Sequence, residues 1–262
     1  MQAKKEFIQI FDTLSQTRHR YEVFRDFVIC ASASLHNAAV HSEVLESRYM
    51  EAIHRYPKEE TLLFPKLFTQ LVDILNTHPH DALGQLYMEL DLGSEHMGQY
   101  FTPSEISKLM AKLQGAAARL ENQQYITLHD PASGAGGMIL AVADDLIQAG
   151  YDPAQKMWAQ CIDIDRTAAM MCYIQLALWN IPAQVIVGNT LSMTQEEVYY
   201  TPAHYMHRWE ERLRKDWEEP LSPSPQVTDL SDTSDDASRV PDAMSPSPKR
   251  GKVDQIGFDF DI

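Results

Sequence analysis

A run of small residues follows a short apolar stretch in the middle of the chain. Residues 125–128 read YITL, and DPASGAGG follows shortly after, from Asp130 to Gly137. Glycines at the end of a strand let a ligand approach the backbone closely because they carry no side chain. The helix that follows offers the positive end of its dipole, and Asp130 can hold a cationic ammonium group. The segment therefore predicts a ligand-binding loop.

Two further polar residues follow apolar stretches later in the chain. Asp163 comes after residues 158–162, and Asn189 lies in the sequence GNT of residues 188–190. An acid at the end of a second strand can accept both hydroxyls of a ribose, and an asparagine amide can read the edge of adenine. A glycine-rich turn alone would also suit a dinucleotide or a phosphate. Two plainer roles stay open, with Asp163 capping the next helix and Asn189 making a turn.

The elements that must position these residues alternate between strands and helices. Short apolar stretches predict strands over 126–129, 158–162 and 185–187, with a possible fourth over 198–200. Helical spacing predicts helices over 138–148 and 168–179, and Thr102 is expected to cap a helix before them. Strand, helix, strand, helix, strand implies a parallel sheet with right-handed crossovers. The first 95 residues follow helical spacing throughout.

Composition limits the partners of the chain. A formal net charge of −15 repels phosphate, so DNA binding would require a local basic patch or another subunit. Three cysteines without paired spacing indicate free thiols, a cytoplasmic protein and no metal site. No apolar run is long enough for a membrane span, so no membrane partner is expected.

The motifs together resemble the adenine-N6 DNA methyltransferases, especially the modification subunits of type I restriction systems. The matching segments are GQYFTP (98–103), DPASGAGG, DID (163–165) and GNT, over roughly residues 85–192. The resemblance implies a Rossmann-like sheet preceded by helices, S-adenosyl-L-methionine as the cofactor and duplex DNA as the substrate, with help from another subunit. It implies these cofactor-binding residues: Tyr100, Phe101, Thr102, Asp130, Pro131, Ala132, Ser133, Gly134, Gly136, Asp163 and Asn189.

The chain departs from this family at the catalytic motif. No Asn/Asp-Pro-Pro-Tyr/Phe sequence follows Thr190, and the nearest segment is Tyr200-Thr201-Pro202. A threonine hydroxyl lacks the carbonyl geometry that would hold an adenine amino group, so this segment is a weak catalytic candidate or a structural turn. The chain is therefore expected to be a truncated relative with an incomplete sheet. It is either an adenine methyltransferase or a catalytically inactive cofactor-binding relative that regulates restriction and modification.

The composition divides the chain into four segments. Residues 1–96 form a helical N-terminal region, and residues 97–216 form the methyltransferase-like domain. Residues 217–254 are rich in Ser, Pro and Asp, and predict a disordered acidic linker. The segment 255–262 resembles peptides that bind sliding clamps, which predicts docking on a replication protein. The same segment could instead be a strand that packs back on the fold.

Overall fold

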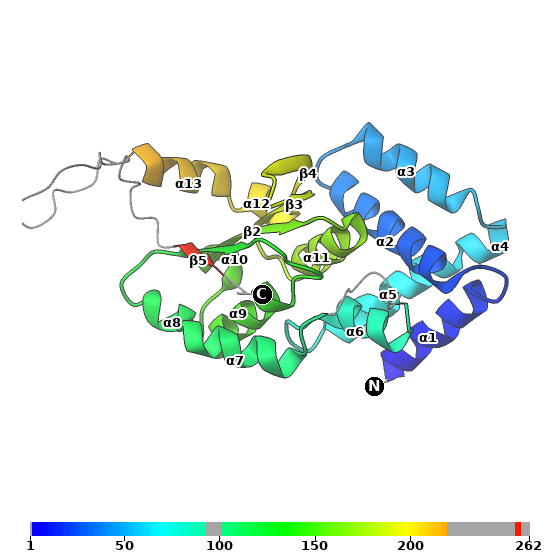
Figure 1. The fold of residues 1–262 in the computed structure, drawn as a ribbon, viewed down its shortest axis with the longest axis horizontal. Helices are drawn as coiled ribbons and strands as arrows, with labels where there is room; N and C mark the ends of the chain where they lie inside the picture. The colour runs from blue at the N-terminus through cyan, green and yellow to red at the C-terminus, as the bar shows by residue number, and fades with distance from the viewer. Residues whose placement is uncertain (1, 93–100, 219–254, 258–262) are drawn as a thin grey trace, which may run out of the picture.

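The computed structural model describes residues 2–92, 101–218 and 255–257. A group of helices precedes an α/β sheet, and the two parts lie side by side (Figure 1). No described helix combines the length and the apolar character needed to cross a membrane. The helices of the N-terminal region are α1 (Gln2–Leu14), α2 (Arg20–Asn37), α3 (Glu43–Ile53), α4 (Lys58–Thr61), α5 (Leu63–Leu75) and α6 (Ala82–Glu89).

Apolar spacing explains why these helices pack together. Phe7, Phe11 and Leu14 lie on one face of α1 and are fully buried, and α1 packs on α5. The ring of Phe7 meets that of Phe27 on α2 edge to face, with centroids 5.5 Å apart. Full burial of such a side chain contributes about 2 kcal/mol. The same hydrophobic core continues under the sheet, so both parts share one interior.

The sheet has five strands in the order β4-β3-β2-β1-β5. β1, β2, β3 and β5 run parallel, and β4 pairs with β3 antiparallel. The carboxyl ends of the three consecutive parallel strands therefore meet at one edge. This arrangement confirms the predicted fold class, and the strands are β1 (Ile126–Asp130), β2 (Met157–Asp163), β3 (Ala183–Asn189), β4 (Thr194–Tyr200) and β5 (Gln255–Gly257).

The helices α9 and α10 connect β1 to β2, and α11 connects β2 to β3. Because right-handed crossovers step in one direction across the sheet, α9 and α11 lie on the same face. α11 also packs against α2 and α6, which joins the helical region to the sheet. α7 begins after Pro103 without a side-chain cap, so the predicted cap by Thr102 is wrong. The remaining helices are α7 (Ser104–Gln114), α8 (Ala116–Arg119), α9 (Gly137–Gln148), α10 (Pro153–Lys156), α11 (Arg166–Leu178), α12 (Pro202–Met206) and α13 (Trp209–Glu218).

The C-terminal segment contributes the edge strand β5. Gln255, Ile256 and Gly257 pair with residues 127–129 of β1, as the alternative interpretation of a strand packing back on the fold expects. Residues 258–262 of the expected docking motif, and residues 219–254 of the expected linker, lie outside the described residues. Residues 217–218 belong to α13, so the predicted linker begins too early in the sequence.

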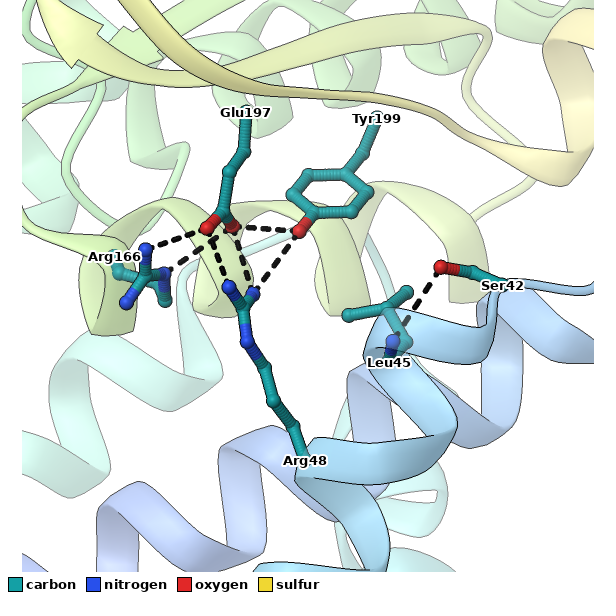
Figure 2. A network of polar contacts seen from close by, with 6 residues as sticks. All are labelled: Ser42, Leu45, Arg48, Arg166, Glu197 and Tyr199. Carbon is teal, nitrogen blue, oxygen red and sulfur yellow. Dashed lines mark hydrogen bonds and ion pairs between the residues drawn. The ribbon is translucent and has the colours of Figure 1, made fainter.

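A charged network fastens α3 to the antiparallel strand β4. The guanidinium of Arg48 on α3 donates two hydrogen bonds to the carboxylate of Glu197, at 2.6 and 2.9 Å. Arg166, at the start of α11, pairs with the same carboxylate from another side (Figure 2). The hydroxyl of Tyr199 donates to Glu197 at 2.6 Å. This bonding ties three separate elements to one carboxylate.

Candidate functional site

The glycine loop, residues 131–136, connects β1 to α9. Gly134 and Gly136 have φ angles of +52° and +86°, in the left-handed region that favours glycine. A Cβ at Gly136 would lie 2.8 Å from Sγ of Cys172 on α11, so a side chain would push the two helices apart. A Cβ at Gly134 would lie 3.4 Å from the ring of Phe101. Gly134 thus faces Phe101, a predicted cofactor-binding residue, and Gly136 allows close helix packing.

Hydrogen bonds fix this loop to the ends of the neighbouring strands. The Ser133 amide donates to the carbonyl oxygen of Ile162 at 2.9 Å, and the Gly134 amide donates to Oδ2 of Asp163 at 2.8 Å. Oγ1 of Thr190, beyond β3, donates to the carbonyl oxygen of Pro131 at 2.7 Å. Three strand ends that are far apart in sequence therefore form one preorganised edge.

Asp130 is a buried carboxylate at the end of β1. Its side chain is 3% exposed, and Oδ1 accepts a hydrogen bond from the Ala132 amide at 3.2 Å. Burial raises its pKa to about 6, and the charge of Asp163 acts in the same direction. Among the described residues, no cationic side chain forms an ion pair with it. A cationic ligand would lower this electrostatic cost.

Asp163 is held by backbone amides on both oxygens. Gly134 donates to Oδ2, and Asp165 donates to Oδ1 at 2.9 Å. Burial raises its pKa despite these bonds. Asp165 caps α11 instead, by accepting from the Thr167 amide, so the capping role considered for Asp163 is wrong. A carboxylate has about four acceptor positions, which leaves room for hydroxyl groups of a ligand.

Asn189 makes the turn considered as its alternative role. Its side-chain oxygen accepts from the amides of Leu191 and Ser192, at 2.9 and 3.3 Å. The amide nitrogen is the group that could still donate to an adenine ring nitrogen. Reading of adenine by Asn189 therefore stays a prediction, limited to this donor.

A small cavity of about 60 Å³ opens above the glycine loop. Several residues of the predicted cofactor set line it, namely Phe101, Thr102, Asp130, Ala132, Ser133 and Gly134. Pro131 and Gly136 shape the loop from outside this lining, and Tyr100 lies outside the described residues. Within the described ranges, Oγ of Ser133 is buried without a hydrogen-bond partner. An unpaired hydroxyl and an uncompensated carboxylate fit a ligand that carries both cationic and polar groups.

Asp81 is a further lining residue that the sequence did not reveal. It caps α6, where Oδ1 accepts from the Gly84 amide at 2.7 Å, and burial raises its pKa. The amide of Gln175 on α11 donates to Asp81 at 3.0 Å and to the carbonyl oxygen of Ala135 at 2.8 Å. The sequence indicates at most a helix cap here, since the glycine loop lies about 50 positions further on.

The weak catalytic candidates Tyr200, Thr201 and Pro202 lie elsewhere. Because β4 is antiparallel, Tyr200 pairs with Gln184 near the start of β3, at the edge opposite the glycine loop. Oγ1 of the fully buried Thr201 donates to the carbonyl oxygen of Ile181 and accepts from the Ala183 amide. This geometry favours the alternative interpretation of a structural turn leading into α12, and the catalytic role stays a prediction.

Comparison with protein families identifies the class. The family described as N-6 DNA Methylase matches residues 81–220, more than half of the chain. The chain belongs to this family of S-adenosylmethionine-dependent methyltransferases. The family assignment confirms both the resemblance and the cofactor predicted from the motifs, and the glycine loop, Asp130 and Ser133 fit such a ligand. No curated protein matches the chain significantly.

Two solved structures align with part of this chain. One, from Listeria monocytogenes, is described as a class I S-adenosylmethionine-dependent methyltransferase, with 16% identity and a TM-score of 0.38. The other is the type IIG restriction endonuclease BpuSI, with 17% identity and a TM-score of 0.33. They align with 70% and 68% of this chain, but the alignments cover only 52% and 23% of their own lengths. Scores this low establish no shared function.

Proposed function

We propose that this chain binds S-adenosylmethionine at the glycine loop and serves adenine-N6 methylation of duplex DNA. The observation that carries the proposal is the bonding of the loop to the end of the neighbouring strand β2, where Ser133 binds Ile162 and Gly134 binds Asp163. Family membership supports the reaction class. The cofactor supplies an activated methyl group when bound.

Each residue of the site has a role that follows from its surroundings. Asp130, buried and without a cationic partner among the described residues, is suited to hold the cationic end of the cofactor. Asp163 is fixed by two amides and suited to accept ribose hydroxyls. Phe101 lies over Gly134 and against Tyr87, with ring centroids 5.3 Å apart, so it is placed to shield the site from water.

Calorimetric titration with S-adenosylmethionine tests the binding half of the proposal. Asp163→Asn is expected to weaken binding at least tenfold, because an amide offers one acceptor oxygen where the carboxylate offers two. Asp73→Asn, on the exposed surface of α5, is the matched control and should bind as the wild type does. Equal affinity of Asp163→Asn and wild type would remove the assigned role.

Transfer of labelled methyl groups to unmethylated DNA tests the reaction. The chain alone, and the chain mixed with candidate specificity subunits, are incubated with labelled cofactor and duplex DNA. Label in N6-methyladenine, measured after digestion to nucleosides, is the expected result. Label in another base, or in protein, would contradict adenine specificity.

A second candidate function follows from the position of Thr201. The described residues place no asparagine–proline turn at the cofactor edge, and the nearest segment lies at the opposite edge. A catalytically inactive relative that binds cofactor and regulates restriction and modification would have this arrangement. Tight cofactor binding without methyl incorporation under any subunit combination would favour this second candidate.

A further inference from the structure

A second cavity, of about 330 Å³, lies between α2, α3 and the first turns of α11. Four arginines line it, and we call it the arginine cavity: Arg25, Arg48, Arg55 and Arg166. The chain has only 22 lysines and arginines and a net charge of −15. Four arginines around one cavity therefore create a positive local potential, although the chain as a whole is negatively charged.

The carboxylates around the arginine cavity do not fully compensate it. Glu51 lines the cavity, while Asp26 and Glu197 pair with its arginines from outside the lining. Among the described residues that line the cavity or form these ion pairs with its arginines, four positive charges stand against three negative charges. An anion of one negative charge would balance the group.

Arg25 has unused capacity to donate hydrogen bonds. Its guanidinium reaches Asp26 only at 3.5 Å, the outer limit of a hydrogen bond, and its Nε is buried without a hydrogen-bond partner in the part of the chain that the structure describes. The side chain of Arg55, in contrast, bonds to Glu51 at 2.9 Å and to Asp26 at 3.0 Å. Guanidinium groups bind phosphate oxygens through paired N–H donors, which would meet the need of Arg25.

Apolar side chains also line the cavity. Val28, Ala52 and Met170 are each at least 95% buried and line it together with Ile29. An apolar lining beside arginines suits a phosphate that carries the C–H groups of a sugar better than a free inorganic anion. The repeating unit of a nucleic-acid backbone has this composition.

The arginine cavity lies next to the cofactor edge of the sheet. Arg166 directly follows Asp165, the cap of α11, and lies three positions after Asp163. We propose that the arginine cavity binds a backbone phosphate of the DNA strand whose base enters the methylation site. This inference rests on the proposed function, since it assigns part of the DNA contact of the same protein.

Anisotropy of a labelled DNA duplex, titrated with the full chain at several salt concentrations, tests the inference. Arg25→Gln is expected to weaken binding roughly tenfold and to lower the slope of log affinity against log salt by about one. Arg25→Lys keeps the charge and should keep the slope. Lys66→Gln, exposed on α5 and outside the lining of the cavity, removes the same charge and should change affinity far less.

Three outcomes would overturn the inference. Equal duplex affinity of wild type and Arg25→Gln would remove the cavity from the DNA interface without touching the proposed function. Loss of a thermal shift with inorganic phosphate in Arg25→Gln, with duplex affinity unchanged, would assign the cavity to a free anion. No duplex binding by a wild-type chain that binds cofactor, both alone and mixed with the candidate specificity subunits, would remove both the DNA substrate and this contact.

Discussion

The glycine-loop site and the arginine cavity differ in whether the charge of a nearby carboxylate is compensated by cationic side chains. Asp130 is buried beside Asp163, without an ion pair to a cationic residue among the described residues, and burial raises its pKa to about 6. Burial would also raise the pKa of Glu197, but bonds from Arg48, Tyr199 and Arg166 outweigh it and lower the pKa to about 2. At neutral pH the charge of Asp130 therefore destabilises the folded state, and the charge of Glu197 stabilises it. The ionised Asp130 destabilises the fold at neutral pH, so its charge is suited to binding a ligand rather than to a structural role.

The largest expected effect concerns the glycine that packs between α9 and α11. Gly136→Ala should lower the free energy of unfolding by about 4 kcal/mol, combining a positive φ with a clash against Sγ of Cys172. Gly150→Ala is the matched control, because its φ is +85° and no atom lies within 4 Å of its added Cβ. Denaturant unfolding measures both variants. Similar losses for the two would show that the clash is relieved at no cost.

Removing the charge of Glu197 should have the next largest effect. Its pKa lies below the ordinary glutamate value, so its stabilisation is present above about pH 4.5 and is lost as the pH falls towards 2. Glu197→Gln should lower the free energy of unfolding by about 3 kcal/mol at pH 7, and the difference should shrink in acid. The exposed neighbour Glu196 provides the control Glu196→Gln. A constant difference across pH would contradict the network as the cause.

Removing the charge of Asp130 should change the free energy of unfolding in the opposite direction. Its folded pKa lies above the unfolded value, so the folded state binds its proton more tightly and stability falls as the pH rises from about 4 to 6. Asp130→Asn should therefore raise the free energy of unfolding at pH 7.5 by about 2 kcal/mol and lose the advantage below pH 4. Cofactor affinity should fall at least tenfold. Greater stability with unchanged affinity would show that the charge serves no ligand.

The smallest effect is expected at Thr201, the weak catalytic candidate. Thr201→Val removes a buried hydroxyl that bonds to Ile181 and Ala183, which should lower stability by about 1 kcal/mol. Cofactor affinity and methyl transfer per folded molecule should stay at wild-type values. Thr69→Val, at an exposed position of α5, controls for the substitution itself. A selective loss of methyl transfer would return Thr201 to the active site.

The sequence predicts most of the sheet and the loop because these signals are local. Apolar stretches identify β1, β2 and β3 to within two residues at each end, and DPASGAGG identifies the loop between β1 and α9. The direction of β4 was missed because it depends on the tight turn after Asn189, where Met193 has a φ of +57°. The sequence does not show that such a turn reverses the chain.

The remaining parts of both sites depend on contacts between distant segments. Arg25, Arg48 and Arg166 lie on three different helices and Arg55 lies in the turn after α3, so no spacing in the sequence relates them. Asp81 reaches the glycine loop only because α6 packs on α11. Such contacts follow from the packing of the helical region, and helical periodicity alone does not determine which helices meet.

Gln175 couples the glycine loop to the first turn of α6. This fully buried amide bonds to the backbone of Leu83, to Asp81 and to the loop carbonyl of Ala135. If the loop moves and displaces Gln175, Leu83 and Asp81 therefore lose a hydrogen-bond partner. If α6 moves and displaces Gln175, the carbonyl oxygen of Ala135 loses its hydrogen bond. The amide proton of Leu83 should exchange with solvent at a rate set by cofactor occupancy, which makes it a remote reporter of ligand binding.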